Sequence, residues 1–251
     1  MQDRILQISE SGIETADLKV KSLMQNMVNA RTPGFKESDV VVRAFPLYLE
    51  RAEARQRAGT VAGETSRAEG VFQNPIPGTL LQTGKDTDLA IAGDGYFVIQ
   101  CPWGEGYTKD GRFRKDTQGS WKSINGDYPL MGMSGAIEVS PGSEITISPQ
   151  GEVLADKVMV DKIRIVDFAH RDKLGSVGGT IFRMPEGKNL ETIELSTPRI
   201  LQGYLETSNV NVINQMVNLI LLSRIYGVNT KVVQTRDLVL SRALEMGKPA
   251  Q

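Results

Sequence analysis

The chain has 251 residues, with 29 Lys and Arg, 30 Asp and Glu, one His and one Cys. A single Cys excludes an internal disulfide, and one Cys with one His cannot supply the four ligands of a structural zinc site. The net charge of −1 gives the whole chain no attraction for nucleic acid. Composition therefore excludes a disulfide framework and a structural zinc site, and a nucleic-acid partner would need a local basic patch. We expect no metal, no cofactor and no nucleic-acid partner.

The N-terminal segment carries a heptad pattern. Its apolar residues follow a 7-3-4-3-4 spacing, with Ser9 at the missing position, which indicates a coiled-coil seam of about three heptads. The helix is expected to end at Thr32-Pro33-Gly34, because the residue before a proline avoids the α region. The residues of this seam are Leu6, Ile13, Ala16, Val20, Leu23 and Met27.

The N-terminal segment does not have the pattern of a secretory signal peptide. Acidic side chains at Asp3, Glu10, Glu14 and Asp17 interrupt its apolar residues, so we expect no cleavable signal peptide. The most apolar run of the chain, 219–222, is far shorter than a membrane span requires. If the protein leaves the cytoplasm, it does so by a route that needs no ordinary signal peptide.

Glycine and proline are concentrated in the middle of the chain. Of 25 glycines and 11 prolines, 22 and 10 respectively lie between Pro33 and Gly203. Because helix interiors disfavour both residues and turns between strands require them, the sequence predicts an α+β fold with a helix at each end and a strand-and-turn middle. The expected divisions are a helix over 1–32, a linker or arm with the first β elements over 33–88, an antiparallel β domain over 89–203 and a helix over 204–251.

Short apolar runs in the middle segment alternate with turn signals, as in antiparallel β domains. Gly93-Asp94-Gly95 lies between two such runs, and we interpret it as a hairpin turn. Residues 47–58 fit either a short helix or an extended arm, and the sequence does not decide between the two.

The sequence contains near-matches to several catalytic and cofactor motifs, but each lacks a residue that the motif requires. Gly93-Asp94-Gly95 begins like a dinucleotide fingerprint, but Val98 stands where the third glycine should be. The Gly-Lys pairs lack the upstream glycine of a phosphate-binding loop, and Asp86-Thr87-Asp88 lacks the pattern of a calcium loop. Cys101 and His170 are the candidates for a nucleophile pair, and they are more simply a packed thiol and a loop residue. We expect a protein that is not an enzyme.

The C-terminal segment carries two apolar rows. The first alternates by four and three, and it indicates a helix buried against a partner helix. The second runs beside the first and predicts burial on a further side; the alternative is an ordinary buried helix of a compact monomer. The first row is Val212, Met216, Leu219, Ser223, Tyr226, Thr230, Val233, Asp237, Leu240 and Leu244. The second row is Leu221, Ile225, Val228, Val232 and Val239.

Four stretches carry a more specific signal: 26–36, 78–97, 107–113 and 202–211. Together, and in this order, they resemble motifs of the flagellar basal-body rod and hook protein family, most closely its FlgF/FlgG-type rod proteins. The resemblance runs from about residue 5 to 242; Tyr96 stands where the family often has Phe, and Lys109 where it often has Arg. The motif residues are Asn26, Asn29, Thr32, Pro33, Gly34, Phe35, Asp88, Ile91, Gly93, Gly95, Phe97, Tyr107, Asp110, Gly111, Phe113, Gly203, Leu205, Glu206, Ser208, Asn209 and Val210.

The resemblance implies a structural subunit that polymerises helically into a drive shaft and transmits torque to the hook. Its two terminal helices would pair as a coiled coil in the inner layer of a tube, with the second row of the C-terminal helix facing neighbouring subunits. The implied partners are further copies, other rod and hook subunits, the flagellar type III export apparatus and rings around the rod. The implied location is the basal body in the periplasmic space.

One alternative belongs to another functional class. A secreted β-rich binding protein that oligomerises through a terminal coiled coil would show the same apolar rows. Such a protein would form a soluble oligomer of fixed size, whereas a rod subunit would be found in isolated basal bodies.

Overall fold

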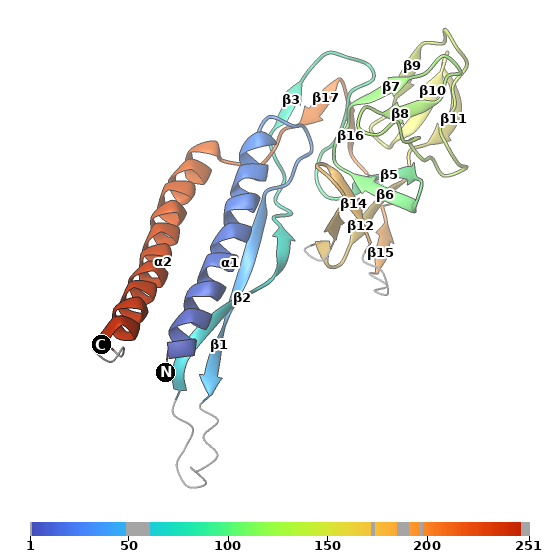
Figure 1. Cartoon of the computed structure of the whole chain (residues 1–251). Coiled ribbons are helices and arrows are strands. Elements are labelled where there is room, and N and C mark those ends of the chain that lie inside the picture. The colour runs from blue at the N-terminus through green and yellow to red at the C-terminus, as the bar shows by residue number, and fades with distance from the viewer. Residues whose placement is uncertain (1, 49–60, 172–173, 185–190, 196–197, 247–251) are drawn as a thin grey trace. The chain divides into compact units, whose positions relative to one another are not determined.

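The computed structural model describes residues 2–48, 61–171, 174–184, 191–195 and 198–246. The chain divides into two compact units (Figure 1). Unit 1 is drawn from residues 1–25, 38–72 and 212–251, and unit 2 from residues 26–37 and 73–211. The prediction of a largely β chain with one N-terminal and one C-terminal helix is confirmed.

Unit 1 contains both long helices and a two-stranded sheet. Its elements are α1 (Gln2–Val28, whose last residues belong to unit 2), β1 (Ser38–Tyr48), β2 (Val61–Gln73, whose last residue belongs to unit 2) and α2 (Val212–Met246), with β1 paired to β2.

The helices meet at Gly12 of α1, where an added Cβ would lie 3.0 Å from Nδ2 of Asn229. Ser22 Oγ donates a hydrogen bond of 2.8 Å to the carbonyl of Ser38, which ties α1 to the start of β1. Strand β1 covers the start of the 47–58 segment, and the rest of that segment lies outside the described residues.

The C-terminal helix begins later than the sequence predicts. The expected helix starts at residue 204, whereas α2 starts at Val212 and Tyr204–Glu206 is a strand, β17. Strand β17 pairs with β3 (Leu80–Gln82), with Leu205 opposite Leu81. The absence of Gly and Pro from 204–211 is compatible with either structure, so composition alone could not place this boundary. Asn211, a residue type preferred at helix N-caps, immediately precedes α2.

Unit 2 is built from antiparallel strands (Figure 1). Its largest sheet has six strands in the order β13-β14-β6-β5-β12-β15, and a smaller one has the order β11-β10-β9. Two-stranded pairs β16-β4, β17-β3 and β7-β8 complete the unit. The strands of the six-stranded sheet are β5 (Tyr96–Cys101), β6 (Gly104–Thr108), β12 (Ile165–Phe168), β13 (Gly175–Ser176), β14 (Ile181–Arg183) and β15 (Thr192–Glu194). The other strands are β4 (Leu89–Ile91), β7 (Phe113–Lys115), β8 (Trp121–Ser123), β9 (Ile145–Ile147), β10 (Glu152–Ala155), β11 (Val158–Lys162) and β16 (Ile200–Gln202).

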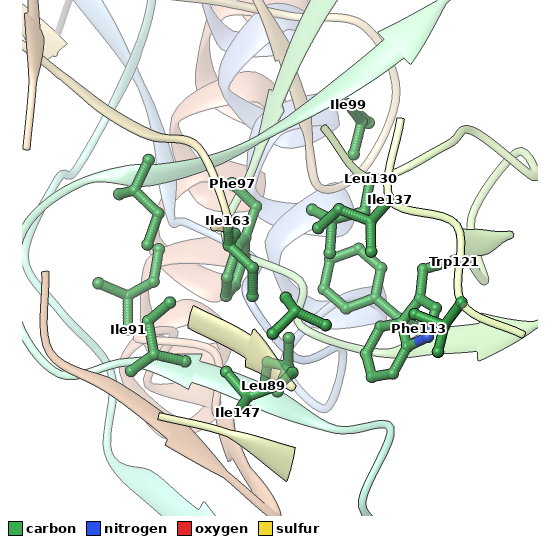
Figure 2. Packing of buried hydrophobic residues seen from close by; sticks show 14 of the residues in the cluster. Leu89, Ile91, Phe97, Ile99, Phe113, Trp121, Leu130, Ile137, Ile147 and Ile163 are labelled. Carbon is green, nitrogen blue, oxygen red and sulfur yellow. The ribbon is translucent and has the colours of Figure 1, made fainter. Parts of the chain in front are cut away.

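Strand β5 lies at the centre of the core because both of its faces are covered. Successive side chains of a strand point to opposite faces. Phe97 and Ile99 accordingly enter one hydrophobic cluster, while Tyr96 and Val98 enter a second cluster on the other face. Figure 2 shows the first cluster, in which the rings of Phe97 and Phe113 meet edge to face with centroids 5.4 Å apart.

The interpretation of Gly93-Asp94-Gly95 as a hairpin turn is wrong. Strand β4 before it pairs with β16, and strand β5 after it pairs with β6 and β12, so the turn carries the chain from one sheet to another. Both glycines have positive φ, 122° at Gly93 and 101° at Gly95. A Cβ at Gly95 would lie 2.7 Å from the side chain of Ile165, so this position requires glycine for space as well as conformation.

A true hairpin joins β10 to β11, and its turn is strained. Ala155 pairs with Val158, which leaves Asp156 and Lys157 as a two-residue loop with φ of 48° and 69°. Two positive φ angles define a type I′ turn, whose usual residues are Asn and Gly. A residue with a Cβ is disfavoured in this conformation, and Lys157 has no short polar side chain to offset the strain.

We expect Lys157→Gly to raise the free energy of unfolding by roughly 0.5–1 kcal/mol. Relief of about 1–2 kcal/mol of left-handed strain exceeds the roughly 0.4–1 kcal/mol by which glycine stabilises the unfolded chain. Urea unfolding followed by fluorescence would measure the change. Lys85→Gly, at an exposed position without positive φ, is the matched control and should lower stability. Equal losses in both variants would contradict the strain.

Candidate functional site

Helix α2 exposes an unusual amount of apolar surface. Among its described side chains only Gln215 and Leu222 are buried. The large apolar side chains that it exposes, each by 41–73%, are Ile213, Met216, Val217, Ile220, Leu221, Ile225, Tyr226, Val228, Val232, Leu238 and Val239. We call this set the apolar face of α2. Large apolar side chains exposed in this number on one helix favour an interaction site.

The predicted rows of α2 contain both exposed and half-buried side chains. All five residues of the second row are exposed. In the first row, Met216 and Tyr226 are exposed, whereas Val212, Leu219 and Val233 are half-buried. The side chains of Leu240 and Leu244 lie outside the described residues. The assignment of the two rows to different partners stays a prediction.

In α1 the predicted seam faces the interior of unit 1 more consistently. Ala16 is 3% exposed, and Ile13, Val20 and Leu23 are half-buried, while the side chain of Leu6 lies outside the described residues. Met27, in unit 2, is also half-buried.

A groove of about 270 Å³ lies beside the contact between the helices in unit 1. Leu23 of α1 and Leu222 of α2 both line it, and Gly12 meets Asn229 further along, so the helices run antiparallel (Figure 1). The residues that line the groove are Lys19, Ser22, Leu23, Asp39, Asn218, Leu221, Leu222 and Ile225.

The four motif stretches converge in unit 2. Gly34 has φ of 70°, and a Cβ there would lie 2.3 Å from the backbone nitrogen of Asp110, so the first stretch packs directly on the third. A Cβ on Gly111 would lie 1.5 Å from the carbonyl oxygen of Leu89, which brings the third stretch onto the second. The backbone nitrogen of Gly34 donates to the carbonyl of Glu206 at 2.7 Å, which joins the first stretch to the fourth.

A buried carboxylate, that of Glu206, lies at this convergence. Its side chain is 1% exposed. Oε1 accepts from Lys36 Nζ at 2.5 Å and from the backbone nitrogen of Gly78 at 2.9 Å, and Oε2 faces Lys109 Nζ at 3.4 Å. A buried charge is tolerated only when it is paired and hydrogen-bonded. Both oxygens face a lysine and Oε1 is hydrogen-bonded, whereas Oε2 has no hydrogen-bond partner among the described residues.

The two lysines are themselves buried, at 1% and 5% side-chain exposure. Each also reaches a backbone carbonyl: Lys36 donates to Ile76 at 3.0 Å and Lys109 donates to Gly93 at 2.7 Å. Burial lowers the pKa of Lys109, while the carboxylate of Glu206 acts in the opposite direction. We call Lys36, Glu206 and Lys109 the buried triad.

Asn209 makes a second set of ties in the same region. Its Oδ1 accepts from the backbone nitrogen of Glu37 at 2.7 Å. Its Nδ2 donates to the carbonyls of Asn74 and Ile76 at 3.1 and 2.9 Å. The Asn74 nitrogen in turn donates to the Glu37 carbonyl at 2.8 Å. One amide side chain therefore connects three segments that are far apart in the sequence.

Comparison with known proteins indicates the context in which the apolar face of α2 and the buried triad occur. Residues 90–155 match the family described as flagellar hook protein FlgE/F/G D1 domain, and residues 201–246 match the one described as flagellar basal body rod FlgEFG protein C-terminal. The chain is 30% identical over 249 residues to the flagellar basal-body rod protein FlgF of Caulobacter vibrioides, which covers 98% of this chain and 99% of that protein. The chain belongs to the flagellar basal-body rod family.

Two further relatives carry the name flagellar basal-body rod protein FlgG. The protein from Buchnera aphidicola subsp. Acyrthosiphon pisum is 28% identical over 259 residues, or 96% of this chain and 98% of that protein. The protein from Bacillus subtilis is 28% identical over 259 residues, or 94% and 96%. The C-terminal match contains Glu206 and the whole of α2, so it spans part of the buried triad and the apolar face.

The remaining motif residues of this rod-family chain shape the surroundings of the triad. Asp110 holds Arg112 through two side-chain bonds, of 2.9 and 2.7 Å, and Asp88 forms a β-bridge with Arg112. Phe97 and Phe113 pack together in the core, and Phe35 is 2% exposed. The motif therefore combines packing, tight backbone contacts and charge.

Lys36, Gly78 and Lys109 lie within the motif stretches, but the sequence indicated no role for them. Charge alone gave no signal, because the same stretches hold several other charged residues. The pairing of Lys36 with Glu206 across 170 positions of sequence could not be read from spacing. Burial of Gln215 in the apolar α2 was also missed, and no pattern in the sequence indicated it.

Neither candidate for a nucleophile pair lies in a setting that favours catalysis. Cys101 is buried in the core, and burial raises its pKa to about 11, which keeps the thiol protonated. His170 is exposed. No group of three or more His, Cys, Asp or Glu suited to a metal occurs within the part of the chain that the structure describes. Within that same part, neither helix is long and apolar enough to cross a membrane.

Two buried tyrosines of unit 2, Tyr96 and Tyr107, should make the protein less stable at high pH. Burial raises the pKa of Tyr96 and of Tyr107 from 10.0 to about 12. A raised pKa in the folded state stabilises the protein below pH 10, and this contribution disappears as the pH rises toward 12. We expect the free energy of unfolding to fall across this range, and to fall less in Tyr96→Phe and in Tyr107→Phe.

Urea unfolding at a series of pH values, with absorbance at 295 nm to follow phenolate formation, would measure both effects. Each variant should lose one late-ionising phenol. Tyr226→Phe, on the exposed surface of α2, is the control and should leave the loss of stability unchanged. A pH profile of Tyr107→Phe identical to that of the unmodified chain would contradict the assignment.

Proposed function

We propose that this chain, a structural subunit of the bacterial flagellar basal-body rod, polymerises helically and transmits torque to the hook. The observation that carries the proposal is the apolar face of α2, which an isolated chain leaves in water. Each large apolar side chain removed from water contributes roughly 1.5–3 kcal/mol. Association that covers several of these side chains is therefore strongly favoured.

The two terminal helices would pair as a coiled coil in the inner layer of the assembly. Their contact at Gly12 and Asn229, and the heptad spacing of α1, support this arrangement. The second row of α2 would then face neighbouring subunits. In a heterologous lattice, each copy offers one surface to the next and a different surface to the previous one.

A subunit of this kind needs no catalytic residue, and we propose that it has none. Its partners would be further copies, other rod and hook subunits, and rings around the rod. The flagellar type III apparatus would export it into the periplasmic space without a cleaved signal. The alternative of a secreted β-rich binding protein has no comparable support, because the relatives match over nearly the whole chain and are named as rod proteins.

Val228→Asp should abolish incorporation into basal bodies while leaving the isolated fold intact. Val228 is 61% exposed, so a carboxylate there costs the monomer little, but it would be buried without a partner in the assembly. The fraction of epitope-tagged protein recovered in detergent-extracted basal bodies would measure incorporation, and circular dichroism would verify folding.

Gln234→Asp is the matched control for this substitution. It places the same charge on an exposed polar position of the same helix. It should reduce incorporation less than about tenfold, whereas Val228→Asp should leave no detectable protein in basal bodies. Normal incorporation of a folded Val228→Asp protein would contradict the proposed role of the apolar face.

Deletion of residues 1–30 should block both assembly and export, because it removes the α1 side of the helix pair. Immunoblots of cytoplasmic, periplasmic and basal-body fractions would distinguish the two steps. A truncated chain that still enters basal bodies would overturn the proposed pairing of the terminal helices.

A further inference from the structure

The chain passes between its two compact units four times. The passages fall at 25/26, 37/38, 72/73 and 211/212. On the side of unit 2, the segments that make these passages are 26–37, 73–79 and 206–211. Nothing in the connectivity requires these segments to lie together, since they are separated by up to about 170 positions of sequence.

Glu206 brings all three segments into contact. Its backbone carbonyl accepts from Gly34 and its Oε1 from Lys36, both in the first segment. The same Oε1 accepts from the nitrogen of Gly78, in the second segment. Glu206 itself lies in the third segment. Lys109, the remaining member of the triad, fixes the carboxylate to the body of the β domain at 3.4 Å.

The other contacts of the region reinforce this arrangement. Lys36 extends from Glu206 to the carbonyl of Ile76, and Asn209 joins Glu37 to the segment containing Asn74 and Ile76. Each of the three segments is thus tied to both of the others. Removal of one tie would leave the others in place if they were independent, but would loosen the whole set if they were cooperative.

We infer that Glu206 is the centre of a clamp on the segments 26–37, 73–79 and 206–211. The hydrogen bonds among these three segments break and form together, as a single cooperative unit. The triad contains two lysines and one carboxylate. If one lysine is lost, the other can still balance the carboxylate, but no other member of the triad can replace the negative charge. Loss of Lys36 leaves one lysine and one carboxylate, a balanced pair that can remain buried. Loss of the Glu206 charge leaves the two buried lysines with no buried counter-charge, because Asp94, the other carboxylate that acts on them, is exposed to solvent. This loss is far more damaging.

Hydrogen exchange measured by NMR on the isolated full-length chain tests the clamp. The reporters are the backbone amides of Gly34, Glu37, Asn74 and Gly78, whose acceptors lie across the segments. Cooperative opening predicts that the four amides share one opening free energy and respond to urea with the same slope. The amides of Val98 and Trp121, in the β domain, serve as references.

Lys36→Met is the main variant, because its balanced charges should allow folding. It should accelerate exchange at all four reporters by a common factor of about 10–100, the loss expected for a hydrogen bond to a charged group. The reference amides should not change. Glu206→Gln should accelerate the reporters more strongly, and should unfold the chain if the two lysines cannot be accommodated.

Asp127→Asn is the matched control, since it removes the carboxylate of an exposed ion pair with Arg114. It should leave the reporters and the references unchanged. The clamp is overturned if Lys36→Met changes the four reporters by different factors, if it leaves them unchanged, or if the references accelerate equally. The measurement involves no assembly, so failure of the clamp is distinguishable from failure of the α2 variants in basal bodies.

Discussion

The burial of the Glu206 carboxylate is the interaction on which the arrangement of unit 2 depends. An unpaired carboxylate in this position would be severely destabilising, so its position is stable only when Lys36 and Lys109 approach it. Those lysines lie in different motif stretches, and each needs its neighbouring glycine to come close. Gly34 and Gly111 remove the Cβ atoms that would hold the stretches apart. The motif can therefore be understood as one charged contact together with the backbone contacts that make it reachable.

Much of the architecture follows from local patterns in the sequence. The distribution of glycine and proline predicted the helix–β–helix order, because it reflects local backbone preferences. Those preferences could not locate the start of α2, since 204–211 lacks both residues and yet begins with a strand. They also could not distinguish a hairpin from a link between sheets at Gly93-Asp94-Gly95, because positive φ serves either purpose. The partner of a strand is decided by residues far away in the sequence.

The candidate site was predictable in outline and not in its chemistry. Heptad spacing located the apolar rows of α2, and the structure leaves the second of them exposed on the single chain. A row pattern does not specify which partner covers it. The motif stretches were visible as sequence, whereas the pairing of Lys36 with Glu206 is a property of the folded chain.

The three segments held together at Glu206 have a mechanical consequence within unit 2. Because each segment is hydrogen-bonded to both of the others, a force on one of them is shared by the contacts of all three. A single segment in this position would bear the same force through its own few hydrogen bonds. The sharing of load arises from topology and one buried charge.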